Sequence, residues 1–68
     1  MSKSANFFGK VAVAHMFGKL ANEEGKKDIP FLDREFMVWL ASLDLPIGAE
    51  ALTILKAWHQ GWHEQNLK

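Results

Sequence analysis

The sequence predicts an all-α fold, a compact three-helix bundle that forms a homodimer. Apolar residues recur at helical spacing in three segments, and two clusters containing glycine and proline separate these segments. No stretch alternates apolar and polar residues as a half-buried strand would. The chain has 68 residues, of which 49% are hydrophobic. We expect one domain over residues 1–68, because chains of this length rarely hold more than one core.

The first helix is predicted over residues 4–24. Ser4 is a suitable N-cap, because a serine oxygen accepts a hydrogen bond from a free N–H group of the first turn. Gly25, followed by Lys26 and Lys27, is a typical helix end, since glycine readily adopts the left-handed conformation found there.

The second helix is predicted over residues 33–44, with Asp33 as its N-cap. Phe36, Leu40 and Leu43 follow one another at spacings of four and three, which places them on one face. Pro46 ends this helix, because a proline disfavours helical geometry in the residue before it.

The third helix is predicted over residues 49–66. Its apolar side is expected to consist of Leu52, Leu55, Trp58 and Trp62.

The first helix has an apolar arc about 200° wide, roughly twice what packing on one side requires. The arc has a sector of mostly small residues, Phe7, Val11, Ala14, Gly18 and Ala21, and a bulky sector, Val13, Met16, Phe17 and Leu20. One short domain has difficulty covering both sectors, so we expect one to face the core and the other a subunit or partner. We assign the small sector to self-association, because small residues let two helices approach closely.

The composition excludes several classes of protein. Lys plus Arg and Asp plus Glu both number 8, so the net charge is zero, which argues against a surface built to hold nucleic acid or anionic lipid. The absence of cysteine excludes disulfides, thiolate metal sites and cysteine nucleophiles. No apolar run approaches the roughly 18 residues of a membrane span, and no export signal is recognisable. We therefore expect a cytoplasmic protein that does not enter a membrane.

His59 and His63 are the clearest candidates for a chemical role, because their side chains can bind a metal ion. Their spacing of four puts both rings on one face of the third helix, as in helices that chelate a transition metal. A zinc site needs a further ligand, which only the tertiary fold can bring from His15, Glu64 or an acid of residues 28–50. We expect instead a solvated polar face that holds no metal ion.

The remaining residues argue against catalysis and against sequence-specific DNA binding. Ser2, Ser4, Ser42 and Thr53 are the only hydroxyl residues, and none lies in a sequence typical of a nucleophile. The third helix, taken as the recognition helix of a helix-turn-helix, offers few basic or amide groups on its outer face. We expect neither an enzyme nor a cofactor.

The C-terminal aromatic segment carries a family resemblance. Trp58, Gly61 and Trp62 resemble the C-terminal tryptophan signature of ribosome modulation factor-like proteins, which are short helical bacterial and phage-encoded chains. Residues 14–21 and the segment from Gly25 to Phe31 look similar to the first part of that family. The matching positions are Gly18, Gly25, Pro30, Phe31, Trp58, Gly61 and Trp62. The resemblance implies a bacterial or phage origin and binding to ribosomes or RNA.

Because the chain is neutral, we favour protein binding over RNA binding. The expected function is that of a non-catalytic phage or mobile-element accessory protein, which binds a bacterial host protein and modulates or inhibits it. The alternative is a ribosome- or RNA-associated factor. The expected interface residues are Phe7, Val11, Ala14, Gly18, Ala21, Trp58, Gly61 and Trp62.

Overall fold

Three α-helices make up most of the computed structural model, which describes residues 3–45 and 48–67, with side chains described from residue 7 onward. These are α1 (Lys3–Glu23), α2 (Arg34–Ser42) and α3 (Ala49–Asn66), and a single-turn 3₁₀-helix, η1 (Pro30–Leu32), precedes α2. The residues that the structure describes contain no strand, so the predicted all-α class with three helices is confirmed. None of these helices combines the length and the apolar character needed to cross a bilayer.

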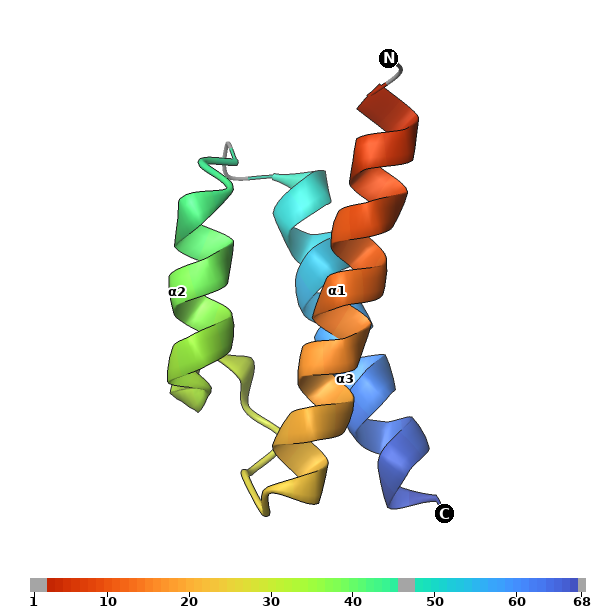
Figure 1. Cartoon of the computed structure of the whole chain (residues 1–68), viewed down its shortest axis with the longest axis vertical. Coiled ribbons are helices and arrows are strands. Elements are labelled where there is room, and N and C mark those ends of the chain that lie inside the picture. Colours follow the sequence, from red (N-terminus) through yellow and green to blue (C-terminus); the bar gives the residue numbers. More distant parts are fainter. Residues whose placement is uncertain (1–2, 46–47, 68) are drawn as a thin grey trace.

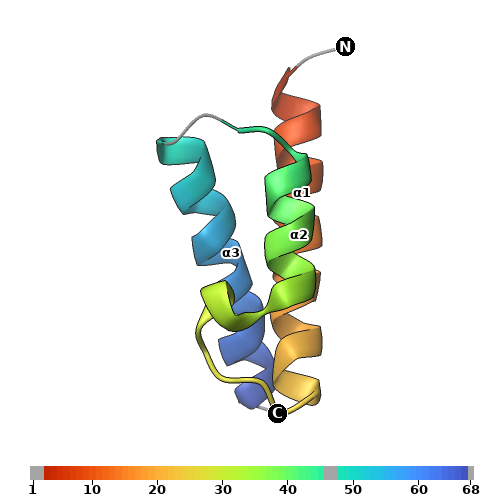
Figure 2. The ribbon, with the colours of Figure 1, turned by 90° about the vertical axis from the view of Figure 1, so that its left-hand side faces the viewer.

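The helices α1 and α3 pack against each other along much of their length, and α2 stands beside this pair (Figure 1). The connector between α1 and α2 lies at one end of the molecule, and the link from α2 to α3 lies at the other (Figure 2). The connector (residues 24–33) therefore runs close to the C-terminal half of α3.

Two helix ends are set by the residues that the sequence suggested, Gly25 and Asp33. Gly25 has a φ of 80°, and the Lys26 N–H donates to the Ala21 carbonyl at 2.8 Å. A glycine in the left-handed conformation followed by such a hydrogen bond is a common way for an α-helix to end. Asp33 caps α2, because its carboxylate accepts from the Phe36 N–H at 3.3 Å. Ser4 lies inside α1 rather than at its cap, and its side chain is outside the described part of the structure. Pro46 also lies outside the described residues.

Aromatic side chains hold α2 to the other two helices. Phe36 is fully buried, and its ring centre lies 5.7 Å from that of Phe17 and 6.2 Å from that of Trp58. Trp39 adds a further ring beside Phe17 and Phe36. One aromatic cluster thus joins all three helices, and Trp58 is its fully buried member on α3.

Two glycines allow α1 and α3 to approach closely. A Cβ atom on Gly18 would lie 2.8 Å from the Trp58 carbonyl carbon, and one on Gly61 would lie 2.9 Å from the His15 carbonyl carbon. Ordinary carbon contacts are about 3.5–4.0 Å. Each glycine therefore faces the backbone of the other helix, with no room for a side chain.

This close approach turns α3 away from the orientation predicted for it. Its buried residues are Ile54, Ala57, Trp58 and Gly61, whereas Leu52 is 57% exposed. The predicted face of large apolar residues is therefore wrong in part. The small residues Ala57 and Gly61 face α1, and Leu52, more than 90° away around the helix, faces solvent.

Candidate functional site

The residues predicted to form an interface lie mainly inside the chain. Ala14, Ala21 and Trp58 are buried core residues, and Gly18 and Gly61 are buried where α1 meets α3. Phe7, Val11 and Trp62 are partly buried and pack against the same core. The assignment of the small sector of α1 to self-association is therefore corrected, because α3 of the same chain covers it.

Asp33 is a buried carboxylate that joins the connector, α2 and α3. The residue is 2% exposed, and besides capping α2 its carboxylate accepts from the Trp58 indole Nε1–H at 3.0 Å. Lys26 Nζ lies 3.1 Å from the same carboxylate and supplies the opposite charge. The hydrogen bond to Asp33, assisted by Glu24, raises the pKa of Lys26 above its ordinary value, although burial acts in the opposite direction.

Trp62 forms a second link between α3 and the connector. Its indole Nε1–H donates to the Lys26 carbonyl at 2.9 Å, and its own carbonyl accepts from the Asn22 amide at 3.0 Å. The two tryptophans of the C-terminal segment are therefore structural, since each fixes the connector through its indole N–H.

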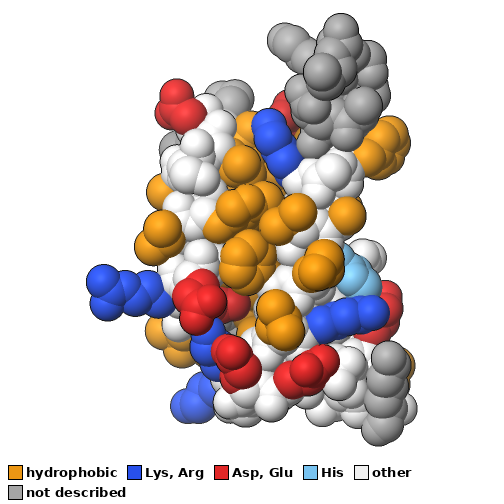
Figure 3. All heavy atoms as spheres, viewed as in Figure 1, with side chains coloured by type: hydrophobic (Ala, Val, Ile, Leu, Met, Phe, Trp, Pro, Cys, Tyr) orange, Lys and Arg blue, Asp and Glu red, His pale blue; other side chains and the backbone are white. Residues whose placement is uncertain are grey.

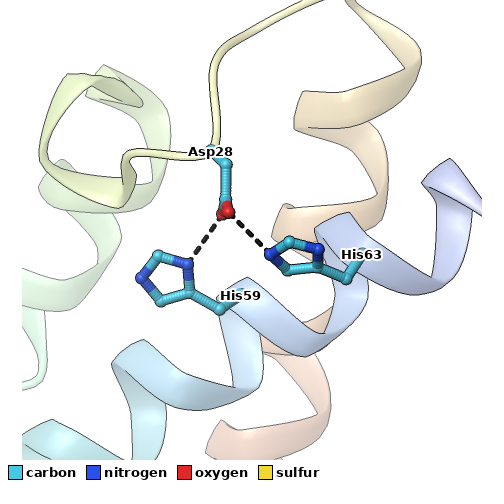
Figure 4. A group of neighbouring side chains, drawn as sticks. All are labelled: Asp28, His59 and His63. Carbon is cyan, nitrogen blue, oxygen red and sulfur yellow. Dashed lines mark hydrogen bonds and ion pairs between the residues drawn. The ribbon is translucent and has the colours of Figure 1, made fainter.

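Asp28, His59 and His63 come together on the outer side of this connection. Asp28 Oδ1 lies 2.7 Å from His59 Nδ1, and Asp28 Oδ2 lies 2.6 Å from His63 Nε2. Figure 4 shows the carboxylate descending from the connector between the two rings, which leave the same side of α3. His63 is exposed, and Asp28 and His59 are partly exposed. The cluster is thus open to solvent.

The sequence showed the histidine pair but could not single out its carboxylate partner. Asp28 was only one of the acids of residues 28–50 available as a further ligand, and it lies 31 positions before His59 in the chain. His15 and Glu64, the other residues considered for that role, instead form a separate contact with each other at 2.9 Å. The fold therefore creates a cluster of two imidazoles and one carboxylate, donors that suit a transition-metal ion.

The bulky sector of α1 remains largely exposed. Val13, Met16 and Leu20 are 37%, 60% and 49% exposed, and helical geometry places them on one side of α1. Phe17, which lies next to this row, is in ring contact with Trp39 of α2. Figure 3 shows hydrophobic side chains gathered over α1 and α2, with charged side chains around them. We call Val13, Met16, Phe17, Leu20 and Trp39 the apolar face.

A shallow hollow of about 300 Å³ lies between α2 and the start of α3. Its lining is mostly apolar and comprises Met37, Leu40, Ala41, Asp44, Leu45 and Ala51. Among the described residues of this lining, Asp44 is the one that carries a charge.

Comparison of the chain with protein-family models, with curated proteins and with solved structures found no match. The resemblance to ribosome modulation factor-like proteins thus remains an expectation based on the sequence.

Proposed function

We propose that the protein is a non-catalytic binding module that docks on another protein through the apolar face. The observation that carries this proposal is the row formed by Val13, Met16 and Leu20, three large apolar side chains exposed along one helix. Exposed apolar groups that lie together are typical of protein-binding surfaces, whereas single ones are common on any protein.

The position of the face on the fold supports this use. The small sector of α1 is covered by α3, and Phe17 of the bulky sector packs against α2. The exposed large residues of the bulky sector are Val13, Met16 and Leu20. Phe17 and Trp39 support it from the side and extend it toward α2. Aromatic residues in such positions supply large contact areas and are enriched at binding hot spots.

The chemistry of the face favours a protein partner over RNA. The chain has a net charge of zero, and the exposed residues Val13, Met16 and Leu20 of the face are hydrophobic. Nucleic-acid binding depends on clustered positive charge. From the sequence resemblance we propose a bacterial host protein as the partner and the bacterial cytoplasm as the setting, with modulation or inhibition of that protein as the consequence.

The test is capture from a bacterial lysate by the immobilised full chain, with quantification of each protein retained. The double variant Met16→Gln/Leu20→Gln removes apolar surface without changing the net charge or the helix propensity greatly. Leu52→Gln, on α3, is the matched control, because it removes an equally exposed leucine outside the apolar face.

Full burial of a leucine or methionine contributes about 1.5–3 kcal/mol, and these two side chains are already about half buried. Burial of the exposed half of each side chain against a partner therefore contributes about 1 kcal/mol to the free energy of binding. Loss of both contributions should make the double variant bind about 30-fold more weakly. Leu52→Gln should retain the partner. Equal capture by the wild type and the double variant would contradict the proposal.

Two further measurements separate the other classes of partner. Capture that disappears after nuclease treatment and weakens steeply with salt would assign the surface to RNA. A homodimer in sedimentation experiments that dissociates in the double variant would assign the face to a second copy of the chain. Either result would replace the proposed host protein.

A further inference from the structure

We propose that Asp28, His59 and His63 bind one Zn²⁺ ion, with the carboxylate and two imidazole nitrogens as ligands and a water molecule in the fourth position. This inference replaces the expectation from the sequence that the histidine pair holds no metal ion, and it does not depend on the apolar face. It rests on three side chains from two separate parts of the fold whose donor atoms all lie within 4.8 Å of one another.

The identity of the donors selects the class of metal ion. Imidazole nitrogen suits Zn²⁺ and its transition-metal neighbours, whereas Mg²⁺ and Ca²⁺ prefer oxygen ligands alone. Two histidines on one helix, joined by one carboxylate, are a ligand set that zinc proteins use when they leave one position open.

The distances are compatible with an ion after a small adjustment. Ligands about 2.0–2.2 Å from Zn²⁺ in tetrahedral geometry lie roughly 3.3–3.6 Å from each other. The Asp28 oxygens are at present 2.7 Å from His59 Nδ1 and 2.6 Å from His63 Nε2. The Asp28 carboxylate and the two imidazole rings therefore need to move apart by about 1 Å to make room for the ion. Rotation of these solvent-accessible side chains provides this movement.

The backbone on both sides of the site is fixed before any ion arrives. His59 and His63 are one turn apart on α3, and each ring stands edge-on to the tryptophan that precedes it. The connector that carries Asp28 is tied to α3 on either side of this residue. Trp62 binds the Lys26 carbonyl before Asp28, and Trp58 binds the Asp33 carboxylate after it.

The exposure of the three side chains provides an entry path and the open coordination position. The cluster lies on the outside of the molecule (Figure 4), so an ion reaches it directly from solvent. A bound ion would cross-link the connector to α3 and stabilise the folded chain, because the unfolded chain does not hold the three ligands together.

The experiment uses the full chain, freed of metal with a chelator and then titrated with Zn²⁺ in a calorimeter. We expect saturation at one ion per chain. At a free Zn²⁺ concentration 100 times the dissociation constant, the melting temperature should rise by roughly 10–20 °C.

Two variants test the proposed ligands, and a third serves as a control. Asp28→Asn keeps the shape of the side chain but removes its charge, and it should weaken Zn²⁺ binding at least about tenfold. His63→Ala should weaken it similarly. His15→Ala is the matched control, because it removes an imidazole that pairs with Glu64 outside the cluster, and it should bind Zn²⁺ like the wild type.

A measurement on the wild type keeps the test decisive if a variant fails to fold. Zn²⁺ should shift the imidazole NMR signals of His59 and His63 together and leave those of His15 in place. The proposal is overturned if the wild type shows no saturable binding or if Asp28→Asn binds as tightly as the wild type. It is also overturned if all three histidines respond alike, since that is the behaviour of adventitious surface binding.

Discussion

The contact between α1 and α3 leads us to expect opposite effects on stability when two glycines of α1 are replaced by alanine. Gly18 lies against the backbone of α3, whereas a Cβ atom on Gly9 would meet nothing within 4 Å. In both positions, replacing glycine by alanine improves the helix propensity by about 0.8–1 kcal/mol. Only at Gly18 does the added methyl group collide with another element, so the pair isolates the effect of the close approach.

The cost at Gly18 follows from the geometry. The new methyl carbon would collide first with the Trp58 carbonyl oxygen, and it would also lie 2.8 Å from the Trp58 carbonyl carbon and 2.9 Å from the Trp62 nitrogen. Normal contact is about 3.5 Å, so the helices must separate by more than about 1 Å to relieve the contact with the oxygen. All three neighbouring atoms belong to helix backbone and cannot rotate away. A backbone clash of this kind lies at the upper end of the cost of overpacking, about 3 kcal/mol or more. After subtraction of the gain in helix propensity, we expect a net loss of about 2 kcal/mol or more for Gly18→Ala.

The assay is thermal and urea unfolding followed by circular dichroism. For a domain of this size, 1 kcal/mol corresponds to about 4–8 °C, so Gly18→Ala should melt at least about 8 °C below the wild type. Gly9→Ala should melt a few degrees above it. Gly18→Ala/Gly61→Ala should cost less than the sum of the single variants, because the first methyl group already separates the helices for the second.

Two results would refute this reasoning. If Gly18→Ala is as stable as Gly9→Ala, the helices do not approach as closely as described. If Gly18→Ala converts a dimer to a monomer in sedimentation experiments while its monomer keeps the wild-type stability, the small sector belongs to a subunit interface after all.

Three further predictions concern the connector and the core. Trp58→Ala should cost about 3–5 kcal/mol in unfolding experiments, because it empties the core and removes the indole donor of Asp33; a loss below 1 kcal/mol would contradict full burial. Asp33→Ala should cost about 2–4 kcal/mol through the lost cap and the unpaired indole N–H, and Asp33→Asn should cost less, since it keeps one acceptor oxygen. The raised pKa of Lys26 means that its contribution to stability is fully present below its unfolded value of 10.5 and is lost as pH rises through the folded value. Lys26→Met should thus have a smaller free energy of unfolding than the wild type at pH 7, and the two values should converge in strongly alkaline solution. A difference in stability that does not depend on pH would contradict the ion pair.

Local patterns predicted local structure well. Gly25 ends α1 and Asp33 caps α2 because both effects depend on a few neighbouring residues, which the sequence displays directly. Trp58 is predicted to lie on the apolar side of the third helix, and the structure buries it fully. Each of these features is determined within one helix or one turn.

The partner of each helix face could not be predicted in the same way. Helical periodicity gives the direction in which Gly18 points but not whether α3 or another chain covers it. The large residue Leu52 suggested the wrong face of α3, since the close approach depends on small residues such as Gly61. The candidate site shows the same limit, because Asp28 reaches His59 only through the tertiary fold.

The pairing of α1 with α3 has a consequence for the order in which the chain is made. Asn22 and Trp62, which share a hydrogen bond across this contact, are 40 residues apart, and α1 is synthesised long before its main packing partner. An isolated helix with so much apolar surface is marginal in water, so α1 gains its stability only when Gly61 and Trp62 have left the ribosome. The nascent chain therefore exposes the small sector of α1, in addition to the bulky one, until the residues of α3 have been made. A chain that stops before Gly61 leaves this surface without its cover and becomes a target for chaperones and proteases.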